Sequence, residues 1–189
     1  MRGIVLYLLL GVAVVLGVTA ISVESLNGEP AVWGLPGIAG LWAWGFAGVG
    51  YLIADRKPEN LIGWLLLGSG VFSGLNGSLG YPGRLEIVTR LWEFSWVPAI
   101  AGLVTALALI PDGRLPSHRW RPLLWGVWIA VAVVAVAIIT DSQYRLAAEI
   151  LMQLSIISLL VSVAVRFRRS RGTERQQLKW IAYSGGVVL

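Results

Sequence analysis

The sequence predicts an all-α membrane protein, built as a polytopic bundle of transmembrane helices. Hydrophobic residues make up 57% of the 189-residue chain and charged residues only 13%, and the mean hydropathy is +0.76. The apolar residues form blocks of roughly 17 to 25 residues, the length that an α-helix needs to cross a bilayer. Lys and Arg fall between these blocks, where loops meet the membrane surface.

Six apolar stretches are long enough to span a bilayer. A seventh begins near Leu178, and its twelve residues up to Leu189 extend only about 18 Å, against a hydrocarbon core of about 30 Å. We therefore expect residues 1–189 to be one transmembrane domain cut off in its seventh helix, the alternative being a short re-entrant or interfacial segment. The predicted spans are Ile4–Ile21, Ala31–Ala54, Leu61–Tyr81, Phe94–Ile110, Leu123–Thr140, Leu146–Val165 and the incomplete 178–189.

The first span, Ile4–Ile21, is longer than the apolar region of about 7 to 15 residues in a signal peptide, so we expect a retained anchor. The third span carries the motif Gly70-x-x-x-Gly74 beside a second ridge of small residues. Small residues let helix backbones approach closely in lipid. Because alanines repeat at the same spacing in the second span, we expect spans two and three to pack tightly, with the third inside the bundle or at a dimer interface. Those alanines are Ala39, Ala43 and Ala47.

Two connections between spans have turn chemistry. Residues 111–116 read Pro-Asp-Gly-Arg-Leu-Pro, in which Pro fixes φ, Asp bonds backbone amides and Gly accepts a positive φ. Pro122 suits the first turn of the fifth helix. Pro58 ends the second helix, and Asn60 can cap the third. Turn formation and helix capping explain both segments without a ligand.

The distribution of Lys and Arg predicts the orientation of the chain. Twelve of the fifteen basic residues fall on one side of the predicted spans, and only Arg84, Arg90 and Arg145 fall on the other. Cytoplasmic loops carry the excess of Lys and Arg, so the N-terminus and residues 166–180 are expected in the cytoplasm. The basic loop should attract anionic lipids there.

On the opposite side, charged residues repeat at helical spacing. Asp141, Arg145 and Glu149 can stack on one helical face as i,i+4 pairs. Glu86, Arg90 and Glu93 repeat this spacing in the preceding outer loop, which allows one shared outer cluster. Two interpretations stay open: a salt-bridged helix start, or an outer polar patch that reads an extracellular or intramembrane signal. Glu149 is the one ionisable candidate inside a span, which disfavours an ion-coupled pump with a buried carboxylate relay.

Several classes of protein are disfavoured. The chain has no Cys, so it has no disulfide, thiolate metal site or thiol nucleophile. The net charge of +5 reflects membrane topology, and we expect no nucleic-acid partner. The single histidine, His118, is interpreted as a solvated loop residue. We predict no catalytic residue, cofactor or metal site in this chain.

Three predicted cytoplasmic segments together resemble the N-terminal membrane domain of actinobacterial-type sensor histidine kinases of two-component systems. Residues 58–66 are similar to a Pro-x-Asn turn followed by Ile-Gly-Trp-Leu-Leu, although Leu61 stands where relatives often have a second proline. Residues 111–114 match Pro-Asp-Gly-Arg, preceded by Ile110 where many relatives have Phe. The matching positions are Pro58, Asn60, Gly63, Trp64, Pro111, Asp112, Gly113, Arg114, Arg166, Arg168, Arg169, Arg171, Glu174, Arg175, Gln176 and Gln177.

The resemblance implies the membrane-embedded input region of a homodimeric kinase in the bacterial plasma membrane. The kinase domain, which uses ATP and Mg²⁺ and passes phosphate to a response regulator, would lie outside this chain. The signal would pass by helix repacking. The competing interpretation is a stand-alone multi-pass membrane protein, either a small-molecule carrier or an interaction scaffold.

Overall fold

The structure is a computed structural model that describes residues 2–27, 37–80, 85–110, 113, 115 and 120–169. This part of the chain forms α-helices and no strand, which confirms the all-α fold. Five helices, α1 to α5, are long and apolar enough to cross a membrane. The crossing of α6 stays a prediction, and segment 178–189 lies outside the described residues. The helices are α1 (Arg2–Asn27), α2 (Ile38–Arg56), α3 (Leu61–Leu79), α4 (Glu86–Leu109), α5 (Arg121–Ile139) and α6 (Arg145–Arg169).

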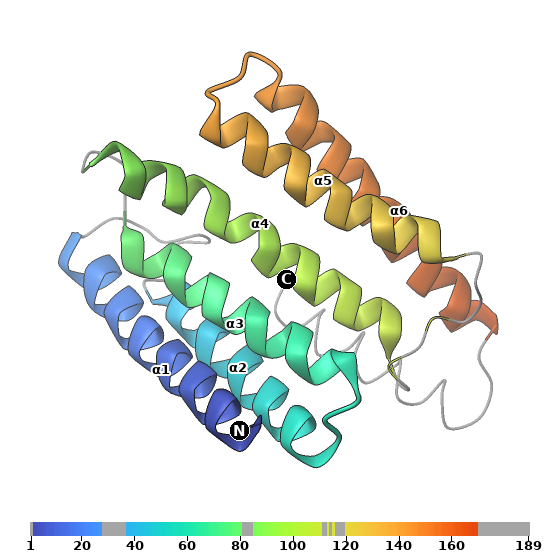
Figure 1. The fold of residues 1–189 in the computed structure, drawn as a ribbon, viewed down its shortest axis with the longest axis horizontal. Helices are drawn as coiled ribbons and strands as arrows, with labels where there is room; N and C mark the ends of the chain where they lie inside the picture. Colours follow the sequence, from blue (N-terminus) through green and yellow to red (C-terminus); the bar gives the residue numbers. More distant parts are fainter. Residues whose placement is uncertain are drawn as a thin grey trace.

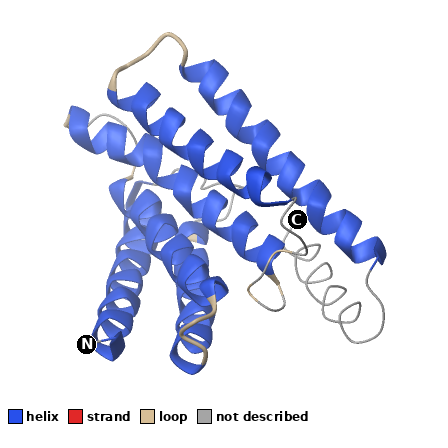
Figure 2. Cartoon of the chain, turned by 45° about the vertical axis from the view of Figure 1, so that its right-hand side comes forward, coloured by secondary structure: helices blue, strands red, loops and turns tan. Residues whose placement is uncertain are grey.

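The helices pack as two groups joined through α4 (Figure 1). Helices α1, α2 and α3 pack against one another, and α5 and α6 form an antiparallel hairpin. Helix α4 lies between the two groups and contacts α3, α5 and α6. In the turned view the α1–α3 group is inclined to the layer formed by α4, α5 and α6 (Figure 2).

Several helices extend beyond the predicted spans. Helix α4 begins at Glu86 rather than Phe94, because Glu86 in its first turn suits the helix dipole and pairs with Arg90 one turn later. Helix α6 continues to Arg169, so the basic segment does not begin as a loop at Arg166. Arginine is a good helix former and suits a helix C-terminus. The apolar stretches marked the hydrocarbon-facing parts of the helices, whereas the helix ends lie among polar residues.

The second predicted span differs at its start. Helix α2 begins at Ile38, after Gly37 with φ +84°, and residues 31–36 lie outside the described residues. The Gly37 amide donates to a carboxylate oxygen of Glu24 on α1. A carboxylate at a helix N-terminus is favourable because the first amides have no partner within the helix.

Small residues set the close contact between α2 and α3, as predicted. A Cβ atom on Gly70 would lie 2.6 Å from Ala47 N and 2.7 Å from Ala43 O, and one on Gly63 would lie 2.6 Å from Ala54 N. Gly77 continues the same face of α3 and reaches α1 as well as α2, since a Cβ on it would lie 2.7 Å from Ala20 Cβ and 2.8 Å from Ala39 Cβ. Helix α3 therefore lies inside the bundle, and its glycines allow that position.

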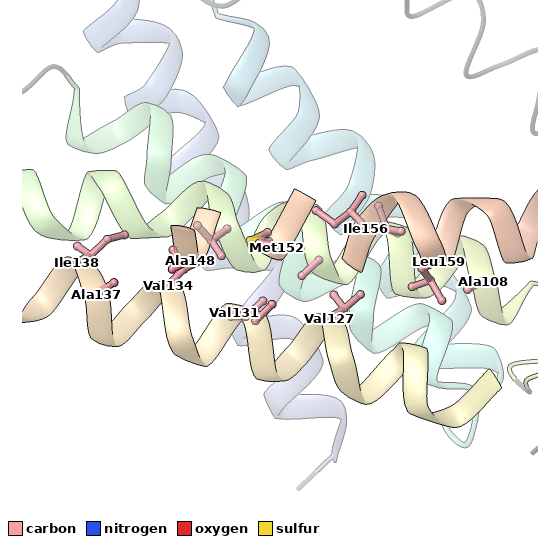
Figure 3. Close-up of a cluster of buried hydrophobic side chains, with 14 residues drawn as sticks. Ala108, Val127, Val131, Val134, Ala137, Ile138, Ala148, Met152, Ile156 and Leu159 are labelled. Carbon is pink, nitrogen blue, oxygen red and sulfur yellow. The ribbon is translucent and has the colours of Figure 1, made fainter. Parts of the chain in front are cut away.

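The second hydrophobic core lies between α4, α5 and α6. Its α5 side includes Val127 and Val134, and its α6 side includes Met152 and Leu159, all fully buried (Figure 3). On α6 the buried residues recur every three to four positions, the pattern of a helix that buries one stripe.

The interface between α3 and α4 is more polar than either core. Asn76 donates from Nδ2 to Trp92 O and Ser95 Oγ, each at 3.0 Å. Further along, the buried hydroxyls of Ser69 on α3 and Thr105 on α4 have no hydrogen-bond partner. Pro98 lies within α4 between these points, and a proline removes one backbone hydrogen bond from a helix.

Candidate functional site

The first candidate site is the group of ionisable residues at the predicted outer end, which we call the outer cluster: Glu86, Arg90, Glu93, Asp141, Arg145 and Glu149. Arg145 connects two helices in it. Its Nη1 donates to Glu93 Oε2 on α4 at 3.0 Å, and its Nε donates to Glu149 Oε1 on α6 at 3.0 Å. The three side chains are 36%, 24% and 32% exposed. The contact is therefore partly shielded from solvent while still reachable from it.

Arg145 stands just before the predicted sixth span. The hydrogen bond to Glu149, and after it the one to Glu93, raises the pKa of the guanidinium against the opposing effect of desolvation. Arg145 therefore remains a cation that holds two carboxylates from different helices.

Arg90 makes a second link, from α4 to the end of α5. Its Nη1 donates to the carbonyl oxygens of Ile138 and, at 3.0 Å, of Ile139, while its Nη2 donates to Glu86 Oε1 at 2.7 Å. The last carbonyls of a helix have no partner within it, and a cation there also opposes the helix dipole. Arg90 thus fixes the start of α4 to the C-terminus of α5, a role that its spacing in the sequence did not indicate.

Asp141 departs from the predicted stack with Arg145. It has φ +50°, and α6 begins only at Arg145. The amide of Asp141 bonds Ile138 O, and that of Ser142 bonds Ala137 O at 3.0 Å. These two bonds around a left-handed residue form a Schellman motif, which ends α5. Asp141 therefore lies in the α5–α6 turn, and the predicted helical stack contains only Arg145 and Glu149.

The second candidate site is at the predicted cytoplasmic end, where Asn60 caps α3 as expected. Its Oδ1 accepts from the Ile62 amide at 3.0 Å, and Trp64 Nε1 donates to Pro58 O at 3.0 Å. These two hydrogen bonds fix the Pro-x-Asn turn to the first turn of α3. This geometry confirms the structural role assigned to Pro58 and Asn60.

The turn after α4 packs onto this cap. Gly113 has φ +73°, and a Cβ atom on it would lie 2.6 Å from Asn60 Oδ1. Its amide donates to Leu109 O at 2.9 Å. The first and second motifs of the sequence therefore meet in space, which nothing in their order along the chain predicted. We call Pro58, Asn60, Trp64 and Gly113 the inner junction.

The third motif is only partly covered by the structure. Arg166, Arg168 and Arg169 lie in the last turns of α6. The remaining motif positions, and His118, lie outside the described residues: Pro111, Asp112, Arg114, Arg171, Glu174, Arg175, Gln176 and Gln177.

Within the part of the chain that the structure describes, no group of three or more His, Asp or Glu side chains could hold a metal ion. The two candidate sites consist of ion pairs, helix caps and a close backbone approach, and their arrangement suits mechanical coupling between helices. Comparison with protein families, with curated proteins and with solved structures finds no match for the chain. The resemblance to sensor histidine kinases rests on the sequence motifs alone.

Proposed function

We propose that this chain is the membrane-embedded input region of a bacterial sensor histidine kinase and relays an envelope or bilayer signal by helix repacking. One observation carries the proposal: a single helix, α4, connects the two candidate sites. Arg90 and Glu93 stand in its first two turns, and Gly113, which bonds back to its Leu109, packs on Asn60. A displacement of α4 at one end therefore reaches the other end.

The outer cluster suits the input side of such a relay. The Arg145–Glu93 pair is about one-quarter to one-third exposed, and pairs of this kind contribute only about 0.2–1 kcal/mol. A charged ligand or a change in local potential can supply that much. The equilibrium constant between two arrangements of the helices would then change by up to about fivefold.

The α3–α4 interface suits the moving part. Ser69 and Thr105 each bury a hydroxyl without a partner, which costs on the order of 1–3 kcal/mol per group. A shift of α4 that gives either hydroxyl an acceptor would recover part of this cost. Pro98 weakens the backbone hydrogen bonding of α4 in the same region. Two arrangements of α4 on α3 can therefore be close in free energy.

On the output side, α6 carries Arg166, Arg168 and Arg169 past the predicted span. In this proposal they contact anionic lipid at the cytoplasmic surface, each worth about 1 kcal/mol. The chain acts as a homodimer, and a following kinase domain would use ATP and Mg²⁺ to phosphorylate its own histidine and then pass the phosphate to a response regulator.

The first test is the reading frame beyond Leu189. We expect a further apolar span, a helix that bears a phospho-accepting histidine, and an ATP-binding domain. A stop codon directly after Leu189 would contradict the kinase assignment and favour the stand-alone carrier or scaffold.

The second test is autophosphorylation of the full-length protein in lipid nanodiscs. Arg145→Gln should change the rate by about threefold, given the energy of a partly exposed pair. Glu93→Gln, which removes the same contact between α4 and α6, should change the rate in the same direction. Glu86→Gln is the control, because Glu86 is 79% exposed and does not join α4 to another helix. An unchanged rate in Arg145→Gln would contradict the role of the outer cluster.

A further inference from the structure

The lipid-facing side of the α5–α6 hairpin contains an open groove of about 570 Å³. Its floor includes Ala137 and Ala148, which are buried, while Ile129 and Leu151 on its walls are 58% and 47% exposed. Small side chains on the floor between larger ones on the walls create the hollow. The volume lies within the roughly 300–1,000 Å³ typical of small-molecule sites.

The groove has a polarity gradient along its length. On α5 it runs from Ile129 to Thr140, which is about 16 Å at 1.5 Å per residue and so about half of the hydrocarbon thickness. Its lining is almost wholly apolar, and the three hydroxyl-bearing residues in it, Thr140, Ser142 and Tyr144, all stand at the predicted outer end. This is the polarity profile of one amphiphile in one leaflet, with its chain inward and its head outward.

The charge at the polar end selects the head group. Residues 84–93 and 141–149 contain four carboxylates and three guanidinium groups, and Asp141 is the one carboxylate among them without an ion pair to a described residue. Asp141 is exposed and stands between Thr140 and Ser142, which both line the groove. The ring of Tyr144 is also exposed at this end, and aromatic faces attract cations.

We propose that this groove binds the alkyl chain of a single-chain cationic amphiphile that enters from the outer leaflet, with its positive head beside Asp141 and Tyr144. Its polar end is the turn that Arg90 holds through the carbonyls of Ile138 and Ile139. The ligand would therefore contact the same α5–α6 turn that the outer cluster fixes to α4. The groove site rests on the same placement of the chain in the membrane as the proposed function, and it gives that function a class of ligand.

The test is photoaffinity labelling of the full chain in phosphatidylcholine nanodiscs. The probe is dodecyltrimethylammonium with a diazirine in its chain, and a dodecyl sulfate analogue is the charge control. We expect the cationic probe to label the groove segments of α5 and α6, and a tenfold excess of unlabelled dodecyltrimethylammonium to compete. Mass spectrometry locates the labelled residues.

Substitutions on α6 give a matched pair. Ala147→Phe fills the groove from an exposed position and should lower labelling at least about tenfold, because several methylene groups lose their contacts. Ala164→Phe makes the same change at an exposed position of α6 outside the groove, and it should leave labelling unchanged. Ala132→Phe fills the groove from α5 if Ala147→Phe does not fold. Asp141→Asn should weaken cationic labelling about threefold and should not weaken labelling by the sulfate analogue.

Three results would overturn the proposal. Equal labelling by both probes would contradict the charge preference. Labelling spread over all exposed helix faces without competition would show only general lipid contact. A phospholipid that stays bound to the purified chain and blocks the probe would make the occupant a bilayer lipid. The labelling experiment does not measure kinase activity, so a negative result contradicts the groove site alone. The absence of a kinase domain from the reading frame would contradict the proposed function alone.

Discussion

The side-chain oxygen of Asn60 lies 2.6 Å from the position that a Cβ atom on Gly113 would occupy. The same oxygen accepts the hydrogen bond that caps α3. The turn after α4 is therefore in contact with the N-terminal cap of α3, about fifty residues earlier in the chain. Glycine at 113 meets two requirements at once, the positive φ and the absence of a side chain.

Gly113→Ala should lower the free energy of unfolding by about 2 kcal/mol, from left-handed strain of about 1–2 kcal/mol and the contact with Asn60. Thermal unfolding in detergent, followed by circular dichroism, measures the loss. Gly126→Ala is the control, since a Cβ there meets nothing within 4 Å and the change should be neutral or stabilising. In an Asn60→Ala background the cost of Gly113→Ala should fall to the strain alone. Equal costs in both backgrounds would refute the contact.

Gly70→Ala should loosen the α2–α3 contact and cost about 1–3 kcal/mol. The new methyl group would meet backbone atoms of Ala47 and Ala43, which cannot turn aside as a flexible side chain can. Gly68→Ala on the same helix has nothing within 4 Å and should gain up to about 1 kcal/mol from helix propensity. Opposite signs for the two variants in denaturant unfolding are expected, and similar effects would argue against the tight pair.

Arg90→Met keeps the alkyl stem but removes the hydrogen bonds to the α5 carbonyls. We expect a loss of about 1–2 kcal/mol, since carbonyls at a helix end lose a charged donor. Glu86→Gln removes only the exposed partner of Arg90 and should cost at most about 0.5 kcal/mol. The comparison is made by thermal unfolding in the same detergent. A larger effect of Glu86→Gln would show that the i,i+4 pair, and not the link to α5, matters.

Topology can be measured cleanly because the chain has no cysteine of its own. Gln143→Cys, in the α5–α6 turn, should react with a membrane-impermeant maleimide in intact cells. Lys57→Cys and Arg168→Cys should react only after permeabilisation, because basic segments remain in the cytoplasm. Reaction of Lys57→Cys in intact cells would show the opposite orientation. Equal reaction of Gln143→Cys and Arg168→Cys in intact cells would show that α6 does not cross.

Much of the architecture could be predicted from local sequence. Apolar stretches of sufficient length predicted the six described helices, the small residues of α2 and α3 predicted their close contact, and Asn60 predicted its cap. These features depend on residues close together in the chain or on the general cost of placing polar groups in hydrocarbon. Helix α4 starts before its predicted span and α6 ends after its own, because an apolar stretch measures hydrocarbon contact and helices continue into polar surroundings.

The sequence by itself determined that the chain is helical and which charges share each predicted side of the membrane. Only the tertiary structure decided which of them meet. It placed Arg145 on Glu93, directed Arg90 to the end of α5, removed Asp141 from the α6 face and brought Gly113 to Asn60. The physical reason is that helix formation depends on hydrogen bonds between near neighbours, whereas contacts between helices depend on the packing of whole faces.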